Sequence, residues 1–300
     1  MNIVEVKNLR VRITGKTILK DINIVIENRP QVIALIGPNG AGKTTLIHSI
    51  LGLQKIARGS ITLSDSRKIA YCPDTPEFDE NLTAIEVMEL SAYLVNQRQP
   101  KSVLIKLLKE VGLENNIYRI ADTFSRGMKQ RLGIAACLLM NPKLLFLDEP
   151  TSALDPIGKQ EMLDIIERLS KSVTVVISSH ELNEVQPISS AVIVLNQGKL
   201  IYSGNVNRFI DVYSNKNVSS VICKDSDSFN RLLSEMENER IKIINSFEDK
   251  REIRFESAKF KETLKIIVKL DGSDKTIEQG DQSLANAFRC AVERKLNHDS

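Results

Sequence analysis

Alternating apolar and polar positions open the chain and predict its first two strands. The segments NIVEV (2–6) and INIVIE (22–27) carry apolar side chains at alternate positions, as antiparallel strands with one buried face do. Three later segments are almost entirely apolar: VIALI (32–36), KLLFLD (143–148) and VTVVISS (173–179). Such runs are typical of strands covered on both faces, so the pattern predicts an α/β core.

Helical periodicity appears between these strands. Thr83 and Glu86 have the spacing of a capping box at a helix start, and the segment SVLIKLLKEVGL ends at Gly112, as expected at a helix C-terminus. A later helix begins at TFSRGM, is capped by a serine and runs to Pro142. These signals predict a helical insertion at about residues 75–140.

A further helix is expected after the second apolar run, with Asp155 as N-cap and Pro156 at the first helical position. It separates the last two buried strands. The α/β core, its antiparallel strands and the helical insertion together predict one domain over residues 1–210.

The remainder, residues 211–300, is expected to form a small accessory domain. Gly198 suggests a hairpin before it, and residues 206–217 read as a connecting helix and linker. The pattern then gives strand, helix, strand, strand, helix, strand and helix. This βαββαβα order predicts an α+β domain with a small sheet and helices on one face, and it contains no chemical motif.

Composition places the chain among globular proteins and limits the classes of partner that we expect. Hydrophobic residues make up 42% and charged residues 26%, the net charge is +3, and both signs are interspersed, so nucleic acid is not an expected partner. No apolar run reaches the ~20 residues that span a bilayer, and the start lacks a signal-peptide core, so a cytoplasmic location is expected. The cysteines lack metal-ligand spacing; they are Cys72, Cys137, Cys223 and Cys290.

The strongest motif is GPNGAGKT (37–44), which has the pattern of a phosphate-binding loop between a strand and a helix. Glycines let backbone N–H groups close around an anion, and the helix N-terminus adds its positive end. Lys43 is expected at the β- and γ-phosphates and Thr44 at magnesium. An accidental glycine-rich turn is the alternative, but the flanking strand and helix favour a nucleotide site. The expected nucleotide contacts are Asn39, Gly40, Ala41, Gly42, Lys43, Thr44 and Thr45.

The segment LLFLDEP (144–150) ends an apolar strand with two carboxylates. Asp148 can hold magnesium and Glu149 can position the attacking water. Hydrolysis is therefore favoured over binding alone. A second anion site is expected where Ser125 caps a helix and the N–H groups near Gly127 are exposed.

GPNGAGKTT, FSRGMKQR, LLFLDEP, TSALDP and VVISSH occur in the order and approximate spacing of the ATP-binding-cassette (ABC) ATPases, which the chain resembles over about residues 1–210. The resemblance implies ATP and Mg²⁺ as ligands and a head-to-tail homodimer. In it, Ser125 and Gly127 of one chain close over the γ-phosphate held by the other. It also implies that Glu149 is the catalytic base, Asp155 communicates across the dimer and His180 contacts the γ-phosphate.

Three positions depart from the family pattern. Ile13 lies about where an aromatic residue usually stacks on adenine, so aliphatic contact replaces ring stacking. Asp74 stands where the family normally has a glutamine that senses magnesium and the transmembrane partner, and we expect it at the metal. Arg126 in FSRGM adds a cation near a phosphate.

This signature, the compact insertion and the C-terminal extension resemble a prokaryotic exporter branch that serves drug, bacteriocin or sodium efflux. Its ATPases pair with a separately encoded permease, which implies a peripheral position on the inner face of the cell membrane. Two alternatives stay open. One is a soluble ABC ATPase acting on nucleic acid, translation or cofactor assembly, and the other is a nucleotide-dependent scaffold without turnover.

Overall fold

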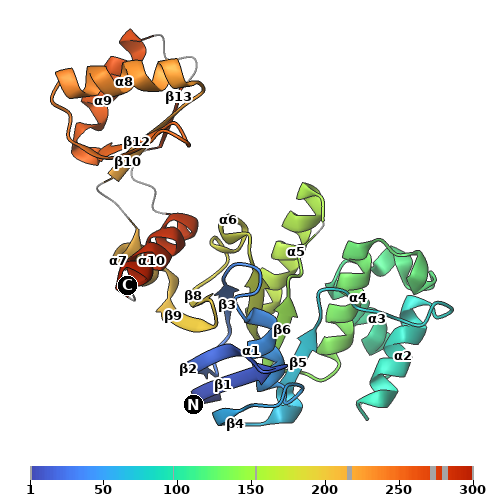
Figure 1. Cartoon of the computed structure of the whole chain (residues 1–300). Coiled ribbons are helices and arrows are strands. Elements are labelled where there is room, and N and C mark those ends of the chain that lie inside the picture. Colours follow the sequence, from blue (N-terminus) through green and yellow to red (C-terminus); the bar gives the residue numbers. More distant parts are fainter. Residues whose placement is uncertain are drawn as a thin grey trace. The chain divides into compact units, whose positions relative to one another are not determined.

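The computed structural model describes residues 2–96, 98–152, 154–214, 218–270, 275–278 and 283–298. Its internal contacts divide the chain into two compact units, Met1–Val206 and Asn207–Ser300. Each unit has its own sheet or sheets and its own buried core (Figure 1). Within the described residues, no helix is both long enough and apolar enough to cross a membrane.

The first unit is built on a six-stranded sheet with the order β5-β6-β7-β3-β8-β9. The first five strands are parallel, and β9 pairs antiparallel with β8. Every residue of β6 and β7 is buried, which explains their continuous apolar sequences. The bounds are β3 Gln31–Ile36, β5 Ile69–Cys72, β6 Leu144–Asp148, β7 Thr174–Ser179, β8 Ala191–Asn196 and β9 Lys199–Asn205.

The predicted hairpin at Gly198 is confirmed. Gly198 has φ +75° between β8 and β9, a left-handed conformation that glycine adopts without steric cost. Its N–H donates to the carbonyl of Ala41 at 3.1 Å, and its carbonyl accepts from the N–H of Lys20 at 2.8 Å. The turn therefore touches both the glycine-rich loop and β2.

An antiparallel sheet of order β2-β1-β4 lies beside the main sheet. The two predicted strands are present as β1 (Asn2–Ile13) and β2 (Lys16–Glu27), and β4 (Arg58–Leu63) pairs with the other edge of β1. Apolar side chains of β1 and β2 share one buried cluster with α1 (Lys43–Ile50) and β3. The core thus fixes β3 and α1, the two elements that flank the glycine-rich loop.

The helical insertion contains α2 (Ala84–Leu94), α3 (Lys101–Glu110) and α4 (Arg126–Leu138), with short 3₁₀ turns at Glu114–Asn116 and Ala121–Thr123. The capping box at the start of α2 is confirmed by the Thr83 N–H, which donates to Glu86 at 2.8 Å.

The predicted extent of the next helix is wrong by four residues, because α4 ends at Leu138 and not at Pro142. Asn141 has φ +44°, outside the helical region, immediately before the proline. Proline disfavours helical backbone in the residue before it, so the helix cannot continue through Asn141 to Pro142.

Helices α5 (Pro156–Leu169) and α6 (Leu182–Val185), and the 3₁₀ turn Ser66–Lys68, complete the first unit. As predicted, Asp155 is the N-cap of α5 and Pro156 its first residue. The Asp155 carboxylate accepts the N–H of Gly158 at 3.1 Å. The cap therefore fixes where α5 begins.

The second unit begins within α7 (Val206–Tyr213) and then has the predicted βαββαβα order, with an antiparallel sheet β11-β12-β10-β13. Side chains of α8 and α9 form a buried core with β10 and β12. The bounds are β10 Val218–Cys223, α8 Ser226–Asn238, β11 Ile243–Phe247, β12 Glu252–Glu256, a 3₁₀ turn Ser257–Lys259, α9 Phe260–Lys269, β13 Lys275–Glu278 and α10 Leu284–His298. The expected part of the linker at 215–217 lies outside the described residues.

Candidate functional site

The glycine-rich loop leaves β3 and enters α1 through two left-handed glycines, Gly40 at φ +78° and Gly42 at φ +103°. A Cβ at Gly40 would meet open space, whereas one at Gly42 would lie 2.6 Å from Leu19. The loop therefore packs against Leu19 at Gly42 and is open at Gly40. Among the described residues, no side chain caps the N-terminus of α1. Its first-turn N–H groups are therefore oriented to receive an anion.

A hollow of about 380 Å³ lies over this loop. Ile13 and Ile18 form an apolar side of the hollow, and Glu149 forms part of its polar side. All seven predicted nucleotide contacts of the loop line it, namely Asn39, Gly40, Ala41, Gly42, Lys43, Thr44 and Thr45. The structure thus brings Ile13, the loop and Glu149 together.

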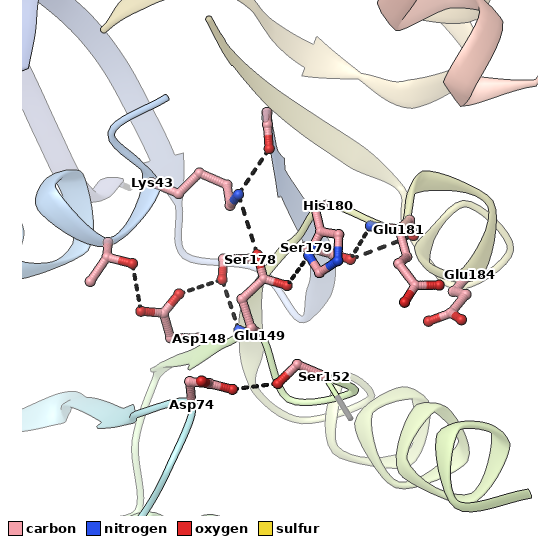
Figure 2. A network of polar contacts seen from close by, with 12 residues as sticks. Lys43, Asp74, Asp148, Glu149, Ser152, Ser178, Ser179, His180, Glu181 and Glu184 are labelled. Atoms are coloured by element: carbon pink, nitrogen blue, oxygen red, sulfur yellow. Dashed lines mark hydrogen bonds and ion pairs between the residues drawn. The ribbon is translucent and has the colours of Figure 1, made fainter. Parts of the chain in front are cut away.

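Lys43 is the buried cation of the site, with 7% of its surface exposed. Its ammonium donates to the carbonyl of Gly37 at 2.8 Å and lies 3.2 Å from Oε1 of Glu149 (Figure 2 shows the Glu149 contact). Burying an ammonium requires such compensation. The lysine is consequently held directly over the loop, where a phosphate would meet it.

Asp148 ends β6 with 4% of its surface exposed, and three hydroxyl groups surround its carboxylate. Oδ2 accepts from Thr44 at 2.8 Å and from Tyr71 at 3.4 Å, while Oδ1 accepts from Ser178 (Figure 2 shows the Ser178 contact). Burial, followed by the Asp148 charge, raises the pKa of Tyr71. The hydroxyl therefore stays protonated and donates to the carboxylate. Its oxygen also lies 3.1 Å from Nε2 of His48.

Glu149 has φ +47°, a left-handed conformation uncommon for a residue with a side chain. Its N–H donates to the Ser178 hydroxyl at 2.9 Å, so the same serine binds the Asp148 carboxylate and the backbone of Glu149. Oε2 of Glu149 lies 2.8 Å from Nδ1 of His180, and Oε1 faces Lys43 (Figure 2). The carboxylate is thus held from two sides.

The loop that carries His180 is anchored to α5. Lys159 donates to Glu181 at 2.8 Å and to Glu184 at 2.7 Å. The Glu181 carboxylate raises the pKa of Lys159, and Lys159 in turn lowers the pKa of Glu181, so both groups are charged at neutral pH. This ionic anchor was not predicted from the sequence, and it orients the segment around His180.

Ser125 and Gly127 lie at the start of α4, as predicted, and they line a different hollow of about 340 Å³ together with Asp155. The Ser125 hydroxyl accepts the N–H of Met128 at 3.3 Å. No residue described as lining this second hollow also lines the one over the glycine-rich loop. Within one chain, therefore, these residues and the loop belong to separate surfaces.

The three residues predicted to meet a metal are not all brought together. Thr44 and Asp148 are in direct contact, but the bonds of Asp74 go elsewhere, to Arg126 at 2.8 Å and to the hydroxyl of Ser152. Among the described residues, no group of three or more His, Cys, Asp and Glu side chains is arranged to hold a metal ion. A divalent ion here would need further ligands such as phosphate oxygens.

Sequence comparisons agree with this geometry. Residues 19–152 match the family model described as ABC transporter. The lantibiotic transport ATP-binding protein SrtF of Streptococcus pyogenes is 40% identical over 215 residues, which are 68% of this chain and 93% of that protein. The chain belongs to the family of ABC transporter ATP-binding proteins. It is the ATP-binding subunit of such a transporter, where ATP hydrolysis drives transport together with membrane components.

Other relatives and solved structures of ABC ATPases extend the match. The bacitracin transport ATP-binding protein BcrA of Bacillus licheniformis is 39% identical over 183 residues, 57% of this chain and 60% of that protein. A solved structure of an ATP binding subunit of an ABC transporter superposes with a TM-score of 0.63 at 30% identity, covering 70% of this chain and 93% of that one. The expected ABC ATPase fold is confirmed.

Proposed function

We propose that this ABC ATPase drives an exporter of antibiotic peptides or related drugs and pairs with a separately encoded permease. The observation that carries the proposal is the similarity to SrtF and BcrA, whose names give lantibiotic and bacitracin transport. The geometry of Lys43, Glu149 and His180 supports active turnover, because a carboxylate held between these groups faces the hollow over the phosphate-binding loop.

The reaction proposed for this site is attack of water on the γ-phosphate of ATP. Lys43 and the first-turn N–H groups of α1 hold the phosphates and stabilise the charge that develops on them. Glu149 orients the water and accepts its proton, and ADP takes the electrons of the broken bond. His180 holds Oε2 of Glu149 and reaches the γ-phosphate. Ile13 lines the hollow and would contact adenine there.

Magnesium fits the oxygens present. Mg²⁺ in nucleotide sites is held by one or two protein oxygens together with phosphates and water. Thr44 and Asp148 offer a hydroxyl and a buried carboxylate in direct contact. Bound there, the ion would neutralise phosphate charge. A contact from Asp74 would require its bonds to Arg126 and Ser152 to break.

The separate surface formed by Ser125, Gly127 and Asp155 supports a head-to-tail homodimer. These residues lie outside the hollow over their own loop and are available to close over ATP on a second chain. A two-fold arrangement would then create two equivalent sites. Pairing with a permease would place the dimer peripherally on the inner face of the cell membrane.

The test is a pull-down from native cells with the full chain as Glu149→Gln, in magnesium and ATP, followed by mass identification. Glu149→Gln keeps the shape of the side chain but removes the proton acceptor, so nucleotide-bound complexes accumulate. Glu27→Gln is the control, because Glu27 pairs with Arg29 on the surface and lines neither the hollow over the glycine-rich loop nor the one at Ser125. Capture of a multi-spanning permease supports the exporter. Capture of nucleic acid or of soluble partners alone overturns it and leaves the ATPase assignment intact.

A further inference from the structure

The segment that follows β5 lies along one face of α4. Gln130 donates to the carbonyl of Pro73 at 3.1 Å. A Cβ at Gly133 would lie only 2.9 Å from Pro76, so this glycine permits close approach of the two segments. Arg126, Gln130 and Gly133 occupy positions i, i+4 and i+7, which share one face of a helix.

At the N-terminal end of this face, three side chains form a cluster. Nη2 of Arg126 donates to Asp74 at 2.8 Å and to the Ser152 hydroxyl at 3.0 Å, and that hydroxyl also donates to Asp74. The backbone N–H of Ser152 donates to the carbonyl of Glu149 at 3.0 Å. A continuous series of bonds therefore joins Arg126 to Glu149 (Figure 2 shows Asp74, Ser152 and Glu149).

We propose that Asp74 is a positioning residue that acts through Arg126. The ion pair, shared with Ser152, fixes the start of α4 against the loop that carries Glu149. Since Ser125 and Gly127 flank Arg126, the pair also sets the orientation of the groups that close over ATP. This role differs from the metal contact expected for Asp74 from the sequence.

The consequence rests on the proposed head-to-tail dimer. There, Ser125 and Gly127 of one chain complete the partner's site, whereas Glu149 acts on the ATP of its own chain. Arg126 and Ser152 thus connect residues that serve different sites. The bonds of Arg126 among the described residues leave from Nη2, and a guanidinium has five N–H donors. Donors therefore remain to meet a phosphate while Asp74 holds the group in place.

The experiment uses the full chain with Asp74→Asn, Arg126→Gln and both together. Asp21→Asn is a matched control, because the Arg10–Asp21 pair has a similar N–O distance of 2.7 Å and side-chain exposures of 41% and 51%, against 41% and 45% for Arg126 and Asp74. Gln130 and Gly133 are unchanged in every variant, so α4 keeps its remaining contacts. Hydrogen exchange of the amides at residues 126–133 is measured first, without a partner.

We expect exchange at the start of α4 to become about two- to five-fold faster in each single variant, the range for an exposed ion pair, with no further increase in the double variant. Asp21→Asn should leave this region unchanged. Exchange equal to that of the parent, or additive effects in the double variant, would overturn the inference.

A second readout separates positioning from general loss of structure. On a Glu149→Gln background, Asp74→Asn, which leaves the Arg126 donors in place, should weaken ATP-dependent dimerisation by a similar factor, while ADP affinity of the single chain stays at the parental value. A matching loss of ADP affinity would also overturn the inference. If the Glu149→Gln parent itself forms no dimer with ATP, the head-to-tail proposal fails, and hydrogen exchange still decides the role of Asp74.

Discussion

Nδ1 of His180 lies 2.8 Å from Oε2 of Glu149, although 31 positions separate the two residues in the sequence. The contact joins the ends of two adjacent parallel strands, β6 and β7. The carboxyl ends of parallel strands meet at one edge of a sheet, which is where α/β proteins place their ligands. The pair therefore works as one unit, and its members should show this in kinetics.

Glu149→Gln should lower the turnover number for ATP by about 10²- to 10⁴-fold, the usual contribution of a general base. His180→Ala should also lower it, and adding His180→Ala to Glu149→Gln should cause little further loss, because both changes disable the same step. Steady-state phosphate release measures all three. Independent, multiplicative losses would show that the histidine acts apart from the glutamate.

Thr44→Val should raise the magnesium concentration needed for half-maximal ATPase activity. Valine keeps the shape of threonine but removes the hydroxyl that donates to Asp148 at 2.8 Å. Thr44 is the proposed hydroxyl ligand of magnesium, and losing it should cost about as much as a hydrogen bond to a charged group, roughly 1.5 kcal/mol, so we expect about a tenfold increase. Magnesium titrations of phosphate release provide the measurement, and Thr44→Ser, which retains the hydroxyl, should remain near the parent.

Gly198→Ala should destabilise the first unit more than Gly15→Ala does. Both glycines are left-handed, at φ +75° and +83°, so both substitutions carry the same conformational cost of about 1 kcal/mol. A Cβ at Gly198 would also lie 1.9 Å from the carbonyl oxygen of Ile18, whereas one at Gly15 has nothing within 4 Å. Urea unfolding compares the two. Equal losses of stability would show that this turn relaxes freely.

Asp225→Asn should remove part of the acid sensitivity of the second unit. Asp225 is the N-cap of α8, and bonds from the N–H and hydroxyl of Ser228 lower its pKa. A carboxylate with a lowered folded-state pKa stabilises the fold above its unfolded pKa of about 4 and loses that contribution as the pH falls through the folded value. Asparagine caps equally well without titrating. Thermal unfolding between about pH 2 and 7 should therefore show a flatter acid limb in the variant.

Local patterns of sequence account for the elements and the principal residues of the site. The capping box at Thr83 and the Asp155 cap each join residues three positions apart, so local sequence identifies them. Strand β4 was not predicted, because none of its residues is buried and its alternation is weak. Periodicity detects a strand only where one face is shielded from water.

Local sequence patterns do not predict contacts between residues that lie far apart in the sequence. Tyr71 meets Asp148 across 77 positions, and Asp74 meets Arg126 across 52. Both contacts depend on how β5 pairs with β6 and how the helical insertion folds back on the sheet, which spacing does not specify. The sequence therefore identified Asp148 and Asp74 as important carboxylates but not the side chains that hold them.

The left-handed backbone of Glu149 implies a conflict between stability and activity at this position. Residues with a Cβ lose about 1 to 2 kcal/mol in this conformation, and asparagine or glycine would lose less. Neither can orient a water molecule as the glutamate carboxylate does. Laboratory selection for thermal resistance alone would therefore favour asparagine or glycine at position 149, which makes the protein inactive. Selection for transport would retain the strained glutamate.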